Sequence, residues 1–260
     1  MPLYYEAYGE GSAILLIHGW TMNAEYWWQK NLPELAESHW VVGLDLRGHG
    51  LSGKTDEGHT LAQYARDVHY LLTTLDLDGV TLVGWSMGTS VVLNYLTQFG
   101  ADRIGSVVFV EQSPRYMSAA DWPYPLAGDY TPEALATFNQ NLRFDRPATV
   151  KRFIRSIFAE APPDETTDNM YAETTKTPTS VAIASMTDMV YADLRPVLTE
   201  VRVPTLLLYG EQSKLFPEGL GEYMQKQVSD SRLITFEESG HCPFWEEPEK
   251  FNREVANFAG

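Results

Sequence analysis

The sequence predicts an α/β fold built on a mainly parallel β-sheet. Short apolar runs, such as AILLI at 13–17 and TLLLY at 205–209, have the length and composition of strands buried on both faces. Between the runs lie longer stretches whose apolar residues recur with the 3.6-residue period of a helix, and this alternation favours parallel strands linked by helices. A chain of 260 residues, 44% of them hydrophobic, is long enough to bury one sizeable core.

The predicted elements follow one another in a regular order. The strand candidates are Ala13–Ile17, Trp40–Leu44, Val80–Val83, Val107–Val110, Thr205–Tyr209 and Leu233–Glu237. The helix candidates are Thr60–Leu75, Met87–Phe99 and Pro248–Phe258.

The strand pattern disappears between residues 113 and 200. Prolines and aromatic residues alternate there over short distances, which is typical of short helices joined by proline turns. Strand-like sequence resumes at Val203. We therefore interpret 113–200 as a helical lid inserted into a core formed by 1–112 and 201–260; a long set of crossover helices is the alternative.

The charge balance argues against several classes of partner. Nineteen Lys and Arg against 35 Asp and Glu give a formal net charge of −16, which repels a phosphate backbone and an anionic membrane surface. The sequence shows no signal-peptide pattern and no apolar stretch of membrane-spanning length. The single cysteine, Cys242, excludes an internal disulfide and fits a reducing compartment. We expect a cytoplasmic monomer or dimer that binds neither nucleic acid nor membrane.

The strongest chemical signal is the run GWSMG at 84–88, which follows a predicted strand and opens a predicted helix. This context is that of a nucleophile elbow, a turn so tight that the residues two positions from the serine must be glycine. An ordinary strand–helix turn with Ser86 as the N-cap is the alternative. We expect Ser86 to be a catalytic nucleophile.

Two further runs supply the groups that such a serine needs. The run SGHCP at 239–243 follows the last predicted strand and places His241 as the general base. An oxyanion hole needs two backbone N–H groups aimed at one point. We expect these from Met87, at a helix N-terminus, and from Trp20, which follows the first strand; His18, two residues earlier, is interpreted as a structural residue of that loop.

These motifs resemble the α/β-hydrolase superfamily over nearly the whole chain, in its lid-bearing serine esterase and cofactor-free haloperoxidase-like branch. The runs DLRGHGLS at 45–52 and GHCPFWEEP at 240–248 strengthen the resemblance. Serine at the nucleophile position argues against the dehalogenases and epoxide hydrolases that use aspartate. Members usually begin with an antiparallel strand pair, but only Leu3–Tyr8 precedes the first parallel strand here. The resemblance therefore implies a sheet of about seven strands whose first edge strand is missing or short.

The acid of the triad departs from the family pattern. Members usually place it in a G-x-x-D-x-x-x-P run after the lid, but the matching run GEQSKLFP at 210–217 has Ser213 at that position. Some dehalogenases of the superfamily carry a glutamate at the end of the strand before the lid, where this chain has Glu111. We expect Glu111 to be the acid, with Glu211 as the alternative; a third possibility is an enzyme that works slowly without an acid.

The combined prediction is a serine hydrolase that cleaves small-molecule carboxylic esters through an acyl-enzyme. No metal-ligand cluster and no dinucleotide-binding run occurs, so we expect no metal and no cofactor. Trp85, Trp122 and Tyr124 are expected to line an apolar substrate pocket, with core packing as the alternative for each. A perhydrolase or haloperoxidase-like activity, C–C bond hydrolysis and a slow-hydrolase receptor for a small molecule are the rival functions.

Overall fold

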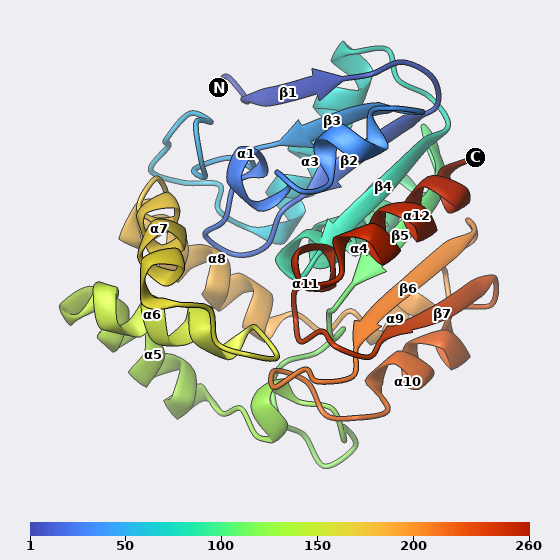
Figure 1. Cartoon of the computed structure of the whole chain (residues 1–260). Helices are drawn as coiled ribbons and strands as arrows, with labels where there is room; N and C mark the ends of the chain where they lie inside the picture. The colour runs from blue at the N-terminus through green and yellow to red at the C-terminus, as the bar shows by residue number, and fades with distance from the viewer.

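A computed structural model describes all 260 residues, and its centre is a seven-stranded β-sheet (Figure 1). The strands are β1 (Tyr5–Tyr8), β2 (Ala13–Ile17), β3 (Trp40–Leu44), β4 (Val80–Trp85), β5 (Ile104–Val110), β6 (Thr205–Gly210) and β7 (Ser231–Phe236). Their order across the sheet is β1-β3-β2-β4-β5-β6-β7, and every neighbouring pair is parallel except β1 with β3. This confirms the predicted fold class, including the single short strand that precedes β2.

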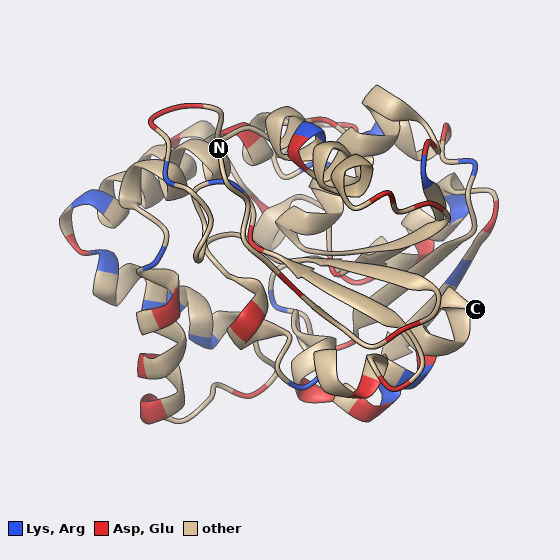
Figure 2. Ribbon diagram, turned by 90° about the horizontal axis from the view of Figure 1, so that it is seen from above, with Lys and Arg blue, Asp and Glu red and all other residues tan.

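Helices cover both faces of the sheet, and α12 crosses in front of it in Figure 1. The flanking helices are α1 (Ala24–Trp27), α2 (Leu32–Leu35), α3 (Leu61–Thr74), α4 (Met87–Phe99), α10 (Leu220–Gln227), α11 (Pro243–Glu246) and α12 (Pro248–Ala259). Strands β2 to β6 contain no Asp, Glu, Lys or Arg, and charged residues lie mainly on the surrounding helices and loops (Figure 2). The resulting core contains 68 buried hydrophobic residues. No helix is long and apolar enough to cross a membrane.

The chain between β5 and β6, residues 111–204, is called the β5–β6 segment below. It holds a short 3₁₀ turn, η1 (Leu126–Gly128), followed by α5 (Pro132–Phe144), α6 (Arg146–Ser156), α7 (Asp164–Thr174), α8 (Thr179–Tyr191) and α9 (Arg195–Leu198). Helices α5 to α8 gather beyond the carboxyl ends of the parallel strands (Figure 1). Each of the helices α5 to α9 has proline at its N-cap or at its first or second position, where the fixed φ suits a first turn and the missing N–H costs nothing.

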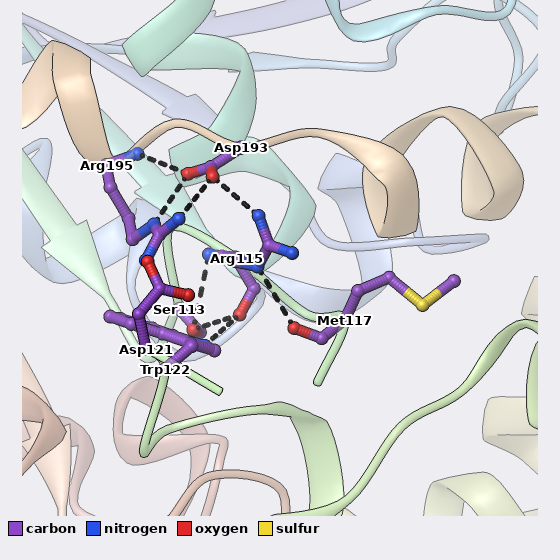
Figure 3. Close-up of polar contacts among 7 residues, drawn as sticks. All are labelled: Ser113, Arg115, Met117, Asp121, Trp122, Asp193 and Arg195. Carbon is purple, nitrogen blue, oxygen red and sulfur yellow. Dashed lines mark hydrogen bonds and ion pairs between the residues drawn. The ribbon is translucent and has the colours of Figure 1, made fainter. Parts of the chain in front are cut away.

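An ion-pair cluster joins the two ends of the β5–β6 segment (Figure 3). Arg115 pairs with Asp193 through Nη1 and Oδ2 at 2.6 Å, and the two backbones form an isolated antiparallel bridge. Arg195 donates to both Asp193 oxygens and to Asp121. The guanidinium of Arg195 lies 5.3 Å from the centre of the Trp122 ring. The cluster therefore holds the first and last turns of the segment side by side.

Candidate active site

Ser86 occupies the turn between β4 and α4 with φ 53° and ψ −121°, a conformation that non-glycine residues rarely adopt. The turn is possible only because two close approaches involve glycine. A Cβ on Gly84 would lie 2.5 Å from the carbonyl carbon of Gly88, and a Cβ on Gly88 would lie 2.2 Å from the carbonyl oxygen of Ile17. The elbow geometry expected from the sequence is therefore present, with the serine at the carboxyl edge of the sheet.

Two backbone N–H groups beside Ser86 have no acceptor in the protein. A Cβ on Gly19 would lie 3.4 Å from Ser86 Cβ, so the loop after β2 runs against the serine. The N–H groups of Trp20, the next residue in that loop, and of Met87 donate no hydrogen bond, although both residues are buried. Buried unpaired N–H groups are rare in folded proteins. This pair is suited to hold a negative oxygen next to Ser86.

His18 has the structural role expected of it. Its Nε2 accepts from the backbone N–H of Leu46 at 3.0 Å, so the proton lies on Nδ1, which donates to the carbonyl of Gly19 at 2.7 Å. Burial lowers the pKa of His18, which keeps the ring neutral. The ring thus connects the loop after β2 with the loop after β3 and has no free nitrogen for catalysis.

His241 lies in the loop between β7 and α11, and its backbone is fixed from three sides. Its N–H donates to the carbonyl of Ile157 at 2.8 Å, and its carbonyl accepts from Trp85 Nε1 at 2.8 Å. Glu246 accepts from the backbone N–H of Gly240 at 2.9 Å, and burial raises the pKa of Glu246. The position of the imidazole therefore depends on β4, the turn after α6 and α11 together.

Glu111 meets His241 inside the protein. Its Oε2 lies 3.2 Å from His241 Nδ1, and both side chains are 1% exposed. Trp85 pairs with Val110 in the register of β4 and β5, so Ser86 and Glu111 each follow one member of that pair at the same edge of the sheet. Glu111 has φ 46°, a left-handed backbone that turns the chain out of β5 directly after its last residue.

Glu211, the alternative acid, is not brought to His241. It is exposed, its backbone N–H donates to the carbonyl of Phe236 at 2.9 Å, and its carboxylate forms no hydrogen bond. Ser213, in the position that the family pattern gives to the acid, instead donates its hydroxyl proton to Glu111 Oε2 at 2.8 Å.

The three expected pocket aromatics, Trp85, Trp122 and Tyr124, pack against other residues of the protein, as the core-packing alternative describes. Trp85 is 1% exposed, and its indole N–H donates a hydrogen bond to the carbonyl of His241. Trp122 packs edge to face on Tyr124 at 5.5 Å and on Tyr223 of α10 at 5.0 Å, and Tyr124 lies tilted against Tyr223 at 5.5 Å. The rings of Trp122 and Tyr124 therefore pack on the half-buried Tyr223 of α10.

Other aromatic residues, which no motif marks, lie beside Ser86 and His241. The Tyr116 hydroxyl donates to Gln112 Oε1 at 2.6 Å. Burial raises the pKa of Tyr116, and hydrogen bonding to Gln112 and Ser86 partly offsets the rise. The Phe216 ring stands 5.7 Å from Tyr116 and 5.8 Å from His241, in each case edge to face.

The ring of Trp20, one of the two residues whose backbone N–H has no acceptor, is covered by helices of the β5–β6 segment. Phe138 of α5 and Phe153 of α6 pack on its ring at 5.5 and 5.4 Å. Its Nε1 donates to the carbonyl of Ala182 in α8 at 2.8 Å. The only signal for these contacts in the sequence is the aromatic content of the segment. No group of three or more His, Cys, Asp or Glu side chains is arranged to hold a metal ion.

Comparison with known proteins identifies the class to which this fold and site belong. Residues 12–248 match the alpha/beta hydrolase fold family, so the chain belongs to that family and is a hydrolase. It is 29% identical to a pimeloyl-(acyl-carrier protein) methyl ester esterase from Aeromonas hydrophila, over 100% of both chains.

Two solved structures are similar over nearly the whole chain. An esterase from Exiguobacterium antarcticum has a TM-score of 0.92 at 27% identity and covers 99% of this chain and 95% of its own. A bromoperoxidase from Bacillus anthracis has a TM-score of 0.91 at 27% identity, with coverages of 98% and 94%. The resemblance to the esterase and haloperoxidase-like branch is thereby confirmed.

Proposed function

We propose that the protein is a serine esterase that hydrolyses small carboxylic esters through an acyl-enzyme. Ser86 is the nucleophile, His241 the general base and Glu111 the acid that orients the base. The observation that carries the proposal is the buried contact between Glu111 and His241 at the same sheet edge as the strained Ser86 turn. Esterases among the relatives support the same reaction class.

The geometry divides the reaction among these groups. Glu111 accepts the Nδ1 proton of His241, which leaves Nε2 free to take the proton of Ser86 as its oxygen attacks the ester carbonyl. The N–H groups of Trp20 and Met87 stabilise the oxygen that becomes negative. His241 then gives its proton to the departing alcohol, and water attacks the acyl-enzyme by the same route in reverse order.

The β5–β6 segment supplies the lid of the proposed enzyme, inserted as residues 113–200 into a core of 1–112 and 201–260. The packing of Phe138 and Phe153 on Trp20 supports this role, because it brings α5 and α6 beside the oxyanion pair. These rings make an apolar wall, so the acyl group of the substrate is apolar and the substrate is a small-molecule ester. A cytoplasmic location and a monomeric or dimeric state stay predictions.

A second candidate is a perhydrolase, which the likeness to a bromoperoxidase favours. Hydrogen peroxide would replace water in the attack on the acyl-enzyme and release a peracid. The peracid would transfer one oxygen to bromide, giving hypobromite and the carboxylic acid. Bromination of a dye in the presence of acetate, hydrogen peroxide and bromide measures this activity.

The test is a panel of nitrophenyl esters of increasing chain length together with labelling by a fluorophosphonate. The wild-type protein should be labelled at one serine and should hydrolyse the esters, and Ser86→Ala should lose both properties by several orders of magnitude. Ser118→Ala changes an exposed serine that bonds Asp129, and it serves as the matched control. Activity or labelling that survives in Ser86→Ala contradicts the proposal.

A further inference from the structure

Ser213 lies on the loop between β6 and α10, and nothing in the reaction described above requires it to be a serine. Its hydroxyl nevertheless has one partner, Glu111 Oε2, at 2.8 Å. The same oxygen lies 3.2 Å from His241 Nδ1. The hydroxyl and the imidazole therefore share one carboxylate oxygen, in a place where the carboxylate is 1% exposed.

The carboxylate of Glu111 is held at both of its oxygens. Oε1 accepts from the backbone N–H of Gly210 at 2.9 Å, and Oε2 accepts from Ser213. A glutamate has three side-chain torsions, so its carboxylate needs at least two anchors to present a chosen oxygen to His241. The hydrogen bond from Gly210 fixes Oε1 but not Oε2, so with this bond alone the carboxylate could still rotate and move Oε2 away from His241. Ser213 supplies the second anchor.

We propose that Ser213 is a positioning residue for the acid: its hydroxyl holds Glu111 Oε2 against His241 Nδ1. The inference rests on the proposed function, since it assigns Ser213 a part in that reaction. Ser213 acts through Glu111 and His241 and reaches neither the ester nor Ser86. Its loss therefore lowers kcat and leaves KM unchanged, because the alignment of the base is needed in the transition state and not for substrate binding.

The experiment compares Ser213→Ala and Ser213→Thr, each in the wild-type background and together with Glu111→Gln, on one nitrophenyl ester. Ser213→Ala should lower kcat about tenfold, the loss expected for one hydrogen bond to a charged group, with KM within about twofold. Ser213→Thr keeps a hydroxyl and should restore most of the lost kcat. In the Glu111→Gln background Ser213→Ala should have no further effect, since the oxygen that it holds no longer acts as the acid.

Ser231→Ala is the matched control, because this serine bonds only the backbone carbonyls of Gln225 and Val228. Thermal unfolding of every variant separates a loss of alignment from a loss of fold. Wild-type kcat in Ser213→Ala, or an equal fall of kcat in both backgrounds, overturns the inference. If either result occurs while Glu111→Gln is severely impaired, the proposed function stands and only the role of Ser213 is overturned. Wild-type kcat in Glu111→Gln overturns the assignment of the acid as well.

Discussion

Replacing Glu111 by glutamine changes one oxygen to an NH₂ group and removes a buried charge without changing the size of the side chain. Three donors face the carboxylate, namely the N–H of Gly210, the hydroxyl of Ser213 and Nδ1 of His241. Glutamine offers one acceptor oxygen, so its NH₂ group must point at a neighbour that is itself a donor. If it points at His241, it stabilises the tautomer whose proton sits on Nε2, and that tautomer cannot accept the proton of Ser86.

The size of the effect follows from this geometry. In trypsin-type triads the wrong tautomer costs about 10⁴ in kcat, and we expect a loss of about 10³ to 10⁴ here. A buried donor left without a partner costs about 1–3 kcal/mol of stability, which lowers the unfolding midpoint by roughly 2–12 °C in a chain of this size. Glu111→Gln should therefore remain folded while it loses nearly all activity.

The assay is kcat for a nitrophenyl ester together with thermal unfolding by circular dichroism. Glu211→Gln is the matched control, because this carboxylate is exposed and forms no hydrogen bond. We expect near-wild-type kcat in that variant. A severe loss in Glu211→Gln with a mild one in Glu111→Gln would refute the reasoning and move the acid to the loop after β6.

The remaining predictions concern the elbow, the ion-pair cluster and the pocket. Gly88→Ala should fold poorly and lose activity, because its Cβ would lie 2.2 Å from a backbone carbonyl oxygen of β2; near-native unfolding temperature and kcat would contradict this. Hydrogen bonding to Arg195 lowers the pKa of Asp193 to about 2. The ionised carboxylate therefore stabilises the fold fully above about pH 4, and this stabilisation is lost as the pH falls through about 2. Asp193→Asn should thus be less stable than wild type at pH 7, and the difference should shrink by pH 2, as urea unfolding would measure. Phe138→Ala should change the preference for ester chain length by about 1–3 kcal/mol in kcat/KM, whereas Trp122→Ala, beside α10, should not; equal profiles for both would count against the proposed pocket wall.

The parts of the site that the sequence predicts well are those whose geometry is set within a few residues. Gly84, Ser86 and Gly88 define the elbow because the approach of the two backbones excludes any side chain at the glycine positions. His18 and Trp20 follow from the same logic, since Gly19 lets the loop after β2 lie against the serine. The parallel sheet was predictable for a related reason, because strands buried on both faces are nearly uncharged.

The aromatic surroundings were not predictable in the same way. The composition of the β5–β6 segment indicates that rings will be buried, but not which element each ring will meet. Trp122 packs on Tyr223, which is about a hundred positions later in the chain, and Phe138 packs on Trp20, which is more than a hundred positions earlier. These long-range ring pairs depend on the path of the β5–β6 segment over the edge of the sheet. The ion-pair cluster around Arg195 holds the two ends of that segment together and so helps to set this path.

The carboxylate that we propose as the acid of the triad lies between these two cases. The sequence places Glu111 and Glu211 near the ends of the adjacent strands β5 and β6, and the register of Val110 with Leu208 brings both ends to one edge of the sheet. The two glutamates differ in backbone conformation. Glu111 has a positive φ, and its carboxylate reaches His241. Glu211 has no positive φ, and its backbone N–H donates to the carbonyl of Phe236 in β7. Glutamate has no preference for a left-handed backbone, so no local sequence pattern predicts the conformation of Glu111. The position after β6 at which the family pattern has an acid holds Ser213 in this chain. Its hydroxyl donates a hydrogen bond to the carboxylate of Glu111, which follows the neighbouring strand β5.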